Sequence, residues 1–508
     1  HVCVTFFSLG NEAGNGTNFY KTYAFLKEQE SERPVNYECI RWKNNTDMFV
    51  PQYPKANDLL DMSECIEDKP IVPSEYQHAM GNANGNFNLM WKLIYKIPNL
   101  QGGFIWDWVD QGLLETGKDG RKYWTYGGDY GGPNVPSDGN FCINGCVNPD
   151  RNPHPAMAEF KYSQQNVGFD VIDITKGVFQ ITNRFFFTDL NEYDVICSIA
   201  SNYDIIKEIN LTNLNEKLQK LEPQESIEID LNSEIGILQP KINTEYFVNF
   251  SVLTKNDNQP FIPKGFEIAH DQFKLPIESI PRPIKHETGP NLSISENSEN
   301  IIISSQKVEF VFDKLKGIVK SYKVDQYEFI SKGFGFQPNF WRPPTDNDYG
   351  NGGPFREKVW KENSHDFKIT RCKAKIKNNV AKLIIHYKLT TNNKYEIIYK
   401  ILASGILKIE ANYIHSNDNE NKFCPNLPRL GIRFRIPQEM SNIVYFGRGP
   451  EENYLDRCSG TRIGLFRTTA EDQYFPYVRP QETGHHIDTR WLSVSDPASS
   501  HGLLINAD

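Results

Sequence analysis

The 508-residue sequence has no apolar run near 18 residues, and its mean hydropathy is −0.55. A membrane-spanning helix needs about 20 consecutive apolar residues, so the sequence excludes one. It also lacks a basic excess, since 55 Lys and Arg face 64 Asp and Glu and leave a formal net charge of −9. Nucleic-acid binding requires a basic surface, so the charge balance argues against a nucleic-acid partner.

Cysteine is scarce and scattered. The nine cysteines are odd in number and include no CxxC pair. This pattern argues against a disulfide framework and against a zinc site, and it predicts reduced thiols in a cytoplasmic protein. The chain begins at His1 rather than Met and enters an apolar stretch at once. We therefore expect a piece of a longer protein, in which a signal peptide stays an open possibility.

Aromatic residues are abundant, at 13% of the chain. Disordered chains are poor in aromatics, so this composition predicts a globular protein. At roughly 100–200 residues for each domain, the length predicts about three or four domains.

The first 165 residues alternate short apolar runs with helical spacing. Residues 2–9 and 103–109 have the pattern of buried strands, whereas residues 18–30 and 86–97 have helical spacing. Alternating β and α units predict a parallel sheet, and strand ends rich in polar residues are typical of (β/α) barrels.

After about residue 165 the apolar period changes from helical spacing to strict alternation. Residues 179–182, 246–250 and 308–312 alternate as half-buried strands do. Turn residues separate these runs, which favours antiparallel sandwiches. Proline residues punctuate a second boundary near residues 275–290. We therefore predict domains at residues 1–165, 166–277 and 278–508.

Two carboxylates follow separate predicted strands of the first domain. Glu12 lies in a Gly- and Asn-rich turn, and Glu75 lies in a turn that also contains His78. Parallel strands end at the same rim, so the two carboxyl groups can converge there, as glycoside hydrolysis requires. The alternative is that each Glu caps the helix that follows it.

A tryptophan-rich segment, residues 101–111, forms the next candidate. Trp106 and Trp108 would project on the same side of an extended strand, where one could stack on a sugar ring and the other pack in the core. We expect Asp107 and Asp110 to pair with Lys or Arg of the barrel rather than to act in catalysis.

Two further carboxylate groups have structural alternatives that we favour. Residues 345–348 resemble an oxygen-rich calcium loop, although a turn in the last domain accounts for so short a match. Glu451 and Glu452 are adjacent, and adjacent strand residues point to opposite faces. We interpret them as a loop and interface feature.

These segments resemble the glycoside hydrolase family 2 β-galactosidases of the large bacterial type. The resemblance covers the whole chain and is most specific in its first third. It rests on SLGNEAGNG (8–16), SEYQHAMGN (74–82), LQGGFIWDWVDQG (100–112), YGGDYG (126–131), NFCINGCV (140–147), DRNPHPA (150–156), NFWRPPTDND (339–348) and GRGPEENY (447–454).

The resemblance implies a retaining, double-displacement hydrolysis of β-galactosides. Glu75 would be the nucleophile and Glu12 the general acid/base. Asn11 would bind the sugar 2-hydroxyl, and Tyr53 would orient Glu75. The remaining implied substrate contacts are His78 with the galactose hydroxyls, Trp106 beneath the sugar, and Asn144.

Metal ions are also implied only by the resemblance. Glu12 would bind a magnesium ion. The carbonyl of Phe141 and the side chain of Asn144 would hold a sodium or potassium ion. A cation beside Glu12 would oppose the raised pKa that a general acid needs near neutral pH.

The implied architecture is the C-terminal half of a (β/α)8 TIM barrel, an Ig-like β-sandwich and a large antiparallel β-sandwich. The resemblance implies that the chain enters at the fourth barrel strand, that the full-length parent is a homo-oligomer, and that the 508 residues alone are inactive. Another family 2 activity, such as β-glucuronidase, and a non-catalytic carbohydrate-binding protein are the alternatives.

Overall fold

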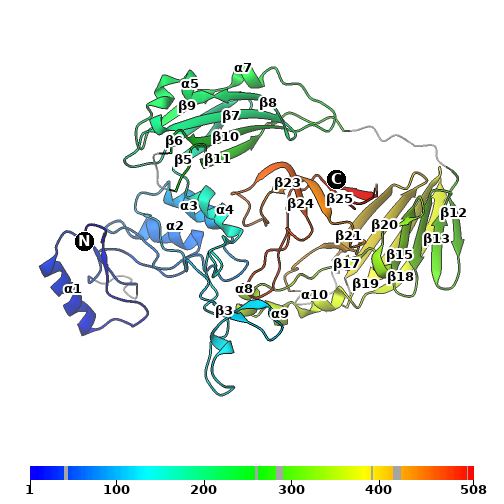
Figure 1. The fold of residues 1–508 in the computed structure, drawn as a ribbon, viewed down its shortest axis with the longest axis horizontal. Coiled ribbons are helices and arrows are strands. Elements are labelled where there is room, and N and C mark those ends of the chain that lie inside the picture. The colour runs from blue at the N-terminus through cyan, green and yellow to red at the C-terminus, as the bar shows by residue number, and fades with distance from the viewer. Residues whose placement is uncertain are drawn as a thin grey trace. The chain divides into compact units, whose positions relative to one another are not determined.

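The computed structural model describes residues 1–38, 44–257, 261–281, 290–390, 393–415, 425–499 and 501–507, and Figure 1 shows its elements in chain order. The chain divides into two compact units. Unit 1 comprises His1–Arg282, Phe446–Phe466 and Tyr474–Thr489. Unit 2 comprises Pro283–Tyr445, Arg467–Gln473 and Arg490–Asp508.

The N-terminal part of unit 1 confirms the predicted alternation of β and α segments. Its strands β1 and β2 pair in parallel, and single parallel bridges continue the pattern through Phe49↔Ile71, Ile71↔Leu100 and Val109↔Val147. Helices separate these segments and include both predicted ones. The elements are β1 (Phe7–Ser8), α1 (Thr17–Gln29), β2 (Val35–Asn36), α2 (Ala56–Cys65), α3 (Phe87–Ile94) and α4 (Ala156–Ser163).

The parallel strands are shorter than the apolar runs predicted. Residues 2–9 contribute only β1, and residues 103–109 form no strand beyond bridges at Ile105 and Val109. The chain leaves the ladder near Pro51, Pro70 and Pro73. Proline has no amide hydrogen to donate, so the pairing there cannot extend over many residues.

A buried apolar cluster packs the helices α2, α3 and α4 against this parallel segment. The rings of Phe87 and Phe160 meet edge to face with centroids 4.7 Å apart, and Ile71 and Tyr76 are fully buried beside them. The core therefore joins α3 and α4 to the strand ends that carry the polar residues.

Two antiparallel sheets form a sandwich in residues 167–274 of unit 1, drawn in green in Figure 1. Inward residues alternate along β6, where Phe179 and Ile181 are fully buried, and along β10, where Val248 and Phe250 are. The alternation predicted from the sequence is confirmed here. The sheets are β5-β6-β9 and β11-β10-β7-β8, with β5 (Val167–Asp173), β6 (Val178–Asn183), β7 (Tyr193–Ser201), β8 (Asp204–Asn210), β9 (Ser226–Asp230), β10 (Tyr246–Thr254) and β11 (Glu267–Lys274).

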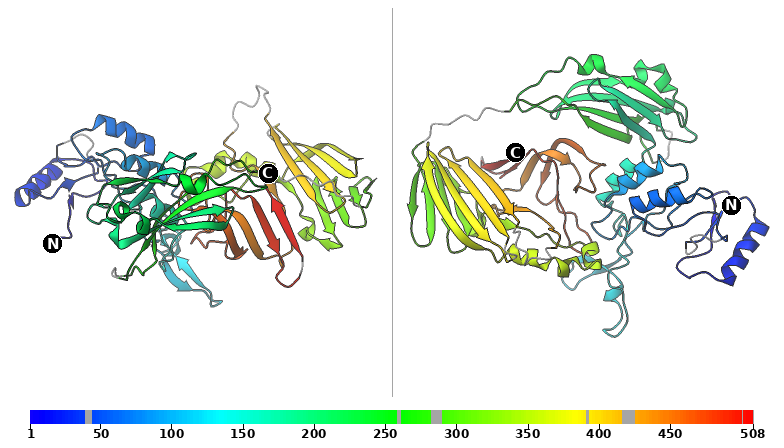
Figure 2. Two further views of the ribbon diagram at one scale, coloured as in Figure 1. Left: turned by 90° about the horizontal axis from the view of Figure 1, so that it is seen from above. Right: turned by 180° about the vertical axis from the view of Figure 1, so that it is seen from behind.

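Unit 2 is built on a second antiparallel sandwich, whose two layers are yellow and yellow-green in Figure 2. Its core includes the fully buried Phe310, Tyr387 and Tyr399. The layers are β12-β13-β14-β15-β16 and β18-β19-β20-β21, with β12 (Ser293–Glu296), β13 (Asn300–Ser304), β14 (Val308–Asp313), β15 (Ile318–Val324), β16 (Tyr327–Glu328), β18 (Lys368–Lys377), β19 (Val380–Lys388), β20 (Lys394–Leu402) and β21 (Leu407–Ile414).

Short elements complete the chain. They are β3 (Leu113–Thr116), β4 (Lys122–Thr125), η1 (Gly127–Asp129), η2 (Leu190–Glu192), α5 (Leu211–Leu214), α6 (Glu216–Gln219), α7 (Asn232–Ile235), η3 (Ser331–Gly333), β17 (Gln337–Asn339), α8 (Asp346–Gly350), α9 (Gly353–Arg356), α10 (Lys358–Asn363), β22 (Gly431–Arg433), β23 (Asn442–Gly449), β24 (Arg462–Thr469), β25 (Trp491–Ser495) and β26 (Gly502–Asn506).

Two properties predicted from composition can be compared with the described part of the chain. None of its helices is long and apolar enough to cross a membrane. Its cysteines are free thiols, whereas Cys39 and Cys424 lie outside the described residues. The Pro283 position of the predicted second boundary also lies outside them.

Candidate functional site

Glu75 lies at the end of a parallel segment and is only 8% exposed. Its Oε1 accepts a hydrogen bond from Asn11 Nδ2 at 3.2 Å, and its Oε2 accepts one from the Tyr53 hydroxyl at 2.7 Å. The backbone amide of Tyr53 also donates to the Glu75 carbonyl at 2.8 Å. Both carboxylate oxygens are therefore held by neutral donors from two other strand ends.

Glu12 lies on the exposed edge of the same group of turns. Its Oε1 accepts a hydrogen bond from Gln52 Nε2 at 2.5 Å, and its backbone amide donates to Glu38 Oε2 at 2.8 Å. Its φ of +51° places it in the left-handed region. Because Gln52 precedes Tyr53 and forms a parallel bridge with Glu75, one dipeptide contacts both carboxylates.

The helix-capping alternative for the two glutamates is wrong. The N-cap residue of α1 is Gly16 and that of α3 is Asn86, and neither helix has a side-chain cap there. Glu75 instead accepts bonds from Asn11 and Tyr53, and Glu12 from Gln52, across the strand ends.

Burial affects two side chains around Glu75. Burial, followed by the hydrogen bond to Glu75, raises the pKa of Tyr53, so its phenol keeps the proton that it donates. Burial also lowers the pKa of His78, and the negative charge of Glu75 opposes this only in part. His78 is therefore neutral near pH 7. Its ring lies 5.9 Å from that of Tyr53 and 5.5 Å from that of Phe141, centroid to centroid.

Trp106 and Asn144 lie next to each other through the backbone. The Trp106 carbonyl accepts a hydrogen bond from the Ala79 amide at 2.7 Å, and the Asn144 carbonyl accepts one from the Asp107 amide at 2.8 Å. Trp106 is half-buried, whereas Trp108 is 61% exposed, so neither tryptophan is a core residue.

The expected pairing of Asp107 and Asp110 with Lys or Arg is wrong. Asp107 accepts a hydrogen bond from Gln111 Nε2 at 2.9 Å, and burial raises the pKa of its carboxyl group. Asp110 lies 3.1 Å from His154 Nε2 and accepts a bond from the Gly145 amide at 2.7 Å. The backbone returns to this point after residue 150 and places His154 beside Asp110.

Glu12, Phe141 and Asn144 are the residues expected to bind metal ions. Within the described ranges, no cluster of three or more His, Cys, Asp or Glu side chains could hold a metal, and the magnesium role expected of Glu12 stays a prediction. Asn144 differs, because its Oδ1 is buried and has no hydrogen-bond partner among the described residues. An unpartnered buried oxygen suits a monovalent cation, which prefers oxygen ligands.

The two structural alternatives for other carboxylates have different outcomes. Residues 345–348 begin helix α8 rather than a turn: Thr345 and Asp348 form a reciprocal cap, and Arg342 pairs with Asp348 at 2.8 Å. Glu452 is a buried loop residue that pairs with Arg457 at 3.0 Å.

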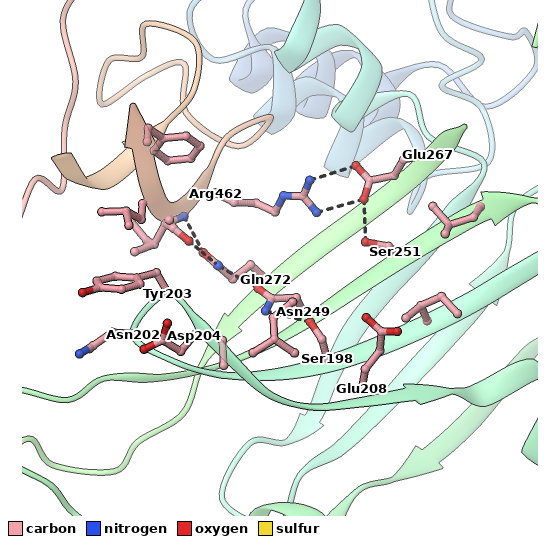
Figure 3. A pocket seen from close by; sticks show the side chains of 18 residues that line it. Ser198, Asn202, Tyr203, Asp204, Glu208, Asn249, Ser251, Glu267, Gln272 and Arg462 are labelled. Atoms are coloured by element: carbon pink, nitrogen blue, oxygen red, sulfur yellow. Dashed lines mark hydrogen bonds and ion pairs between the residues drawn. The ribbon is translucent and has the colours of Figure 1, made fainter. Parts of the chain in front are cut away.

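A pocket of about 690 Å³ lies elsewhere in unit 1, between the outer face of the sandwich and residues 462–466 (Figure 3). Its polar groups pair with one another. Arg462 binds both oxygens of Glu267 at 3.1 Å, and Gln272 exchanges two hydrogen bonds with the backbone of Ile463. These bonds attach residues 462–466 to the sheet. None of the predicted site residues, all of them within the described ranges, lines this pocket.

Sequence reasoning missed two residues that the structure connects to the site. Gln52 binds Glu12, and Asn82 links the turn after Glu75 to distant parts of the chain. The signal for Gln52 was its place at a strand end beside Tyr53. Asn82 stood within the SEYQHAMGN motif, but its partners lie about 370 to 400 residues away.

The described part of the chain has a parallel βα segment, which carries Glu12 and Glu75, and two antiparallel sandwiches. Three family models match the chain. They are the glycosyl hydrolases family 2 TIM barrel domain at residues 1–169, the beta-galactosidase domain 4 at residues 179–276, and the beta galactosidase small chain at residues 304–507. The chain belongs to glycosyl hydrolase family 2.

Curated relatives align along nearly the whole chain. A β-galactosidase of Priestia megaterium is 33% identical over 99% of this chain and 47% of its own length. One from Vibrio cholerae is 31% identical over 97% of this chain and 48% of its own length. One from Streptococcus thermophilus is 28% identical over 100% of this chain and 49% of its own length. The chain spans about half the length of the curated relatives that it matches.

Proposed function

We propose that the protein containing this chain hydrolyses terminal, non-reducing β-D-galactose residues of β-galactosides such as lactose, with retention of anomeric configuration. The single observation that carries this proposal is the convergence of Asn11 and Tyr53 on the buried Glu75, with Gln52 joining Tyr53 to Glu12. The relatives named β-galactosidase supply the substrate class.

Glu75 acts as the nucleophile in this proposal. Its oxygen attacks the anomeric carbon, the glycosidic bond breaks, and a covalent galactosyl-enzyme forms. The donors from Asn11 and Tyr53 keep the carboxylate in one orientation, which lowers the entropic cost of reaching the reacting geometry. When the sugar enters, Asn11 can also donate a hydrogen bond from its Nδ2 to the 2-hydroxyl.

Glu12 acts as the acid and then as the base. It protonates the departing oxygen in the first step and takes a proton from the attacking water in the second. Its exposure suits this role, because the leaving group and the water must both reach it. Gln52 fixes one of its oxygens and leaves the other available.

The sugar itself would lie among His78, Trp106 and Asn144. The neutral His78 has a buried Nε2 without a partner among the described residues, which favours a hydrogen bond to a galactose hydroxyl. Trp106 would lie beneath the apolar face of the ring. A sodium or potassium ion held by Asn144 Oδ1 and the Phe141 carbonyl would supply positive charge beside a sugar hydroxyl.

The proposed architecture follows the order of the family models. Residues 1–165 would be the C-terminal half of a (β/α)8 barrel, residues 166–277 an Ig-like sandwich, and residues 278–508 the large sandwich. The parallel bridges that run in sequence order from β1 to Val147 support the barrel. We also propose that the full-length protein is a homo-oligomer.

The test is hydrolysis by the natural full-length protein, with lactose and aryl β-glycosides as substrates and NMR detection of the first anomer released. We expect a β-galactose product and loss of turnover in Glu75→Gln. An α-galactose product would contradict the nucleophilic role of Glu75. If a β-glucuronide is hydrolysed faster than the β-galactosides, the protein has another family 2 activity. Binding without turnover would indicate a carbohydrate-binding protein.

A further inference from the structure

The turn that follows Glu75 contains no regular structure for ten residues. Residues 77–86 precede α3 and include left-handed backbone at Gln77, Gly81, Asn84 and Asn86. Side-chain bonds within the turn are few; one is donated by Asn84 Nδ2 to the Gln77 carbonyl at 2.8 Å. Conformations of this kind persist only when surrounding groups hold them.

Those surrounding groups come from the far end of the sequence, from residues 452–460 and 477–484 of the same unit. Asn82 makes three of the contacts. Its Nδ2 donates to the Tyr454 hydroxyl at 2.8 Å and to the Glu482 carbonyl at 2.8 Å, and its amide donates to Gln481 Oε1 at 2.9 Å. We call residues 452–460 and 477–484 the anchor segments.

The anchor segments hold the turn at two further points. Arg457 donates from its guanidinium to the Ala83 carbonyl at 2.5 Å, and the Asn86 amide donates to the Asp456 carbonyl at 2.6 Å. The approach is close, since a Cβ at Gly85 would overlap the carboxylate of Asp456, whose side chain would have to move. These two bonds and the close approach fix the end of the turn against the anchor segments.

A buried ion pair makes the anchor itself rigid. The side chains of Glu452 and Arg457 are 3% and 4% exposed. Glu452 also accepts bonds from the Tyr477 hydroxyl at 2.6 Å, from Thr483 Oγ1 at 2.9 Å and from the Gly484 amide at 2.6 Å. A carboxylate with this many donors fixes Arg457, and Arg457 fixes the turn.

We propose that Asn82 is a positioning residue for the Glu75 and His78 side chains, and that Tyr454 and the Glu452–Arg457 pair hold it in place. His78 precedes two fixed points of the turn. The first is the Ala79 amide, bound to the Trp106 carbonyl at 2.7 Å, and the second is Asn82, whose Nδ2 binds Tyr454 and Glu482. Loss of the second point frees the turn to move against the nucleophile. This inference rests on the proposed function.

The test uses the natural full-length protein and a 2,4-dinitrophenyl 2-deoxy-2-fluoro-β-D-galactoside. A Glu75 oxygen forms a bond to C1 while dinitrophenolate leaves, so mass spectrometry of the labelled peptide reports the nucleophile. Two variants, Asn82→Ala and Tyr454→Phe, remove the same hydrogen bond from opposite sides. The matched control is Asn88→Ala, because Asn88 joins the same regions through Ser459 Oγ at 2.8 Å but lies in α3.

We expect the inactivation rate constant at saturating probe to fall at least about tenfold in both variants, because small misplacements of reacting groups have large effects on rate. The control should remain within about twofold of the wild type. Hydrogen exchange of the peptide covering residues 77–86 should become faster in the two variants only, at an unchanged unfolding midpoint for Tyr454→Phe.

Wild-type inactivation rates in both variants would overturn the proposal, and so would an equal slowing in Asn88→Ala. If the wild-type protein is not labelled at Glu75, the proposed function fails instead. The exchange comparison of residues 77–86 then decides by itself whether Asn82 and Tyr454 hold the turn. Unchanged exchange in both variants would refute that as well.

Discussion

The hydroxyl of Tyr53 donates a hydrogen bond to Glu75 Oε2 at 2.7 Å. The neighbouring Gln52 donates to Glu12 Oε1 over 2.5 Å. Two neighbouring residues at one strand end therefore orient the two carboxylates: Gln52 binds Glu12 and Tyr53 binds Glu75. A shift of this dipeptide would displace the two groups together.

Tyr53→Phe removes the hydroxyl that binds Glu75 and leaves the ring in place. Hydrogen bonds to charged groups contribute about 1.5–3 kcal/mol, so we expect kcat to fall roughly tenfold to a hundredfold. The measurement is steady-state hydrolysis of an aryl β-galactoside. Tyr20→Phe is the control, because Tyr20 is exposed on α1 and should leave kcat unchanged. Equal rates for the two variants would contradict the orienting role.

Glu12→Gln separates the acid role from the nucleophilic role. The leaving group of lactose must be protonated as it departs, whereas dinitrophenolate leaves without a proton. The rate of lactose hydrolysis should therefore fall at least about a hundredfold more than the rate of the first step with a dinitrophenyl galactoside. The comparison is made by pre-steady-state release of dinitrophenolate. An equal loss on both substrates would show that Glu12 does not protonate the leaving group.

The Glu452–Arg457 pair should behave as a buried ion pair. Glu452→Gln and Arg457→Met each leave an unpaired buried group and should cost about 3–5 kcal/mol of unfolding free energy. The double variant should cost less than the sum of the two. Glu362→Gln, at the exposed pair with Lys358, should change stability by less than about 0.5 kcal/mol. Additive losses in the double variant would mean that the two charges are not coupled.

Asp271 should make unfolding pH-dependent. Burial raises its pKa from 3.8 to about 6, although the Gln272 amide and the Tyr162 hydroxyl oppose this. The folded state then binds this proton more tightly than the unfolded state, so the contribution of Asp271 to stability is lost as pH rises from about 4 through about 6. Asp271→Asn should remove that part of the pH dependence of the unfolding midpoint. A midpoint that changes with pH equally in both proteins would refute it.

Phe250 tests the core of the first sandwich. Its ring is fully buried, stacks on Phe169 at 4.9 Å and meets Phe179 edge to face at 5.2 Å, between centroids. Phe250→Ala should cost about 3–5 kcal/mol. Phe187→Ala, at a side chain that is 97% exposed, should change stability by less than about 0.5 kcal/mol. Chemical denaturation measures both, and similar costs would contradict this assignment of the core.

Some of the helices and antiparallel strands could be predicted from apolar periodicity alone. The alternation at Phe179 and Ile181 anticipated β6, and the helical spacing of residues 18–30 anticipated α1. Periodicity failed for residues 103–109, because an apolar run records burial but not whether a backbone partner is present. Only bridges at Ile105 and Val109 were found there.

The candidate site divides in the same way. Glu12 and Glu75 could be named from short motifs, because each follows an apolar strand-like segment, whereas Tyr53 was implied only by the family resemblance. Asp110 could not be interpreted in this way, since its partner His154 arrives from a turn more than 40 residues later. Which side chain lies beside a carboxylate depends on which segments meet, and sequence spacing does not encode that.

The sequence by itself determined the kind of chemistry available and the order of the parallel and antiparallel parts, because residue type and apolar period are local properties. Only the tertiary structure decided that Gln52 and Tyr53 contact both carboxylates and that Asn82 is bound by Tyr454 and Glu482. These contacts join segments up to 400 residues apart, and hydrogen bonds act only over about 3 Å. Such contacts exist only once packing has brought the distant strand ends and turns together.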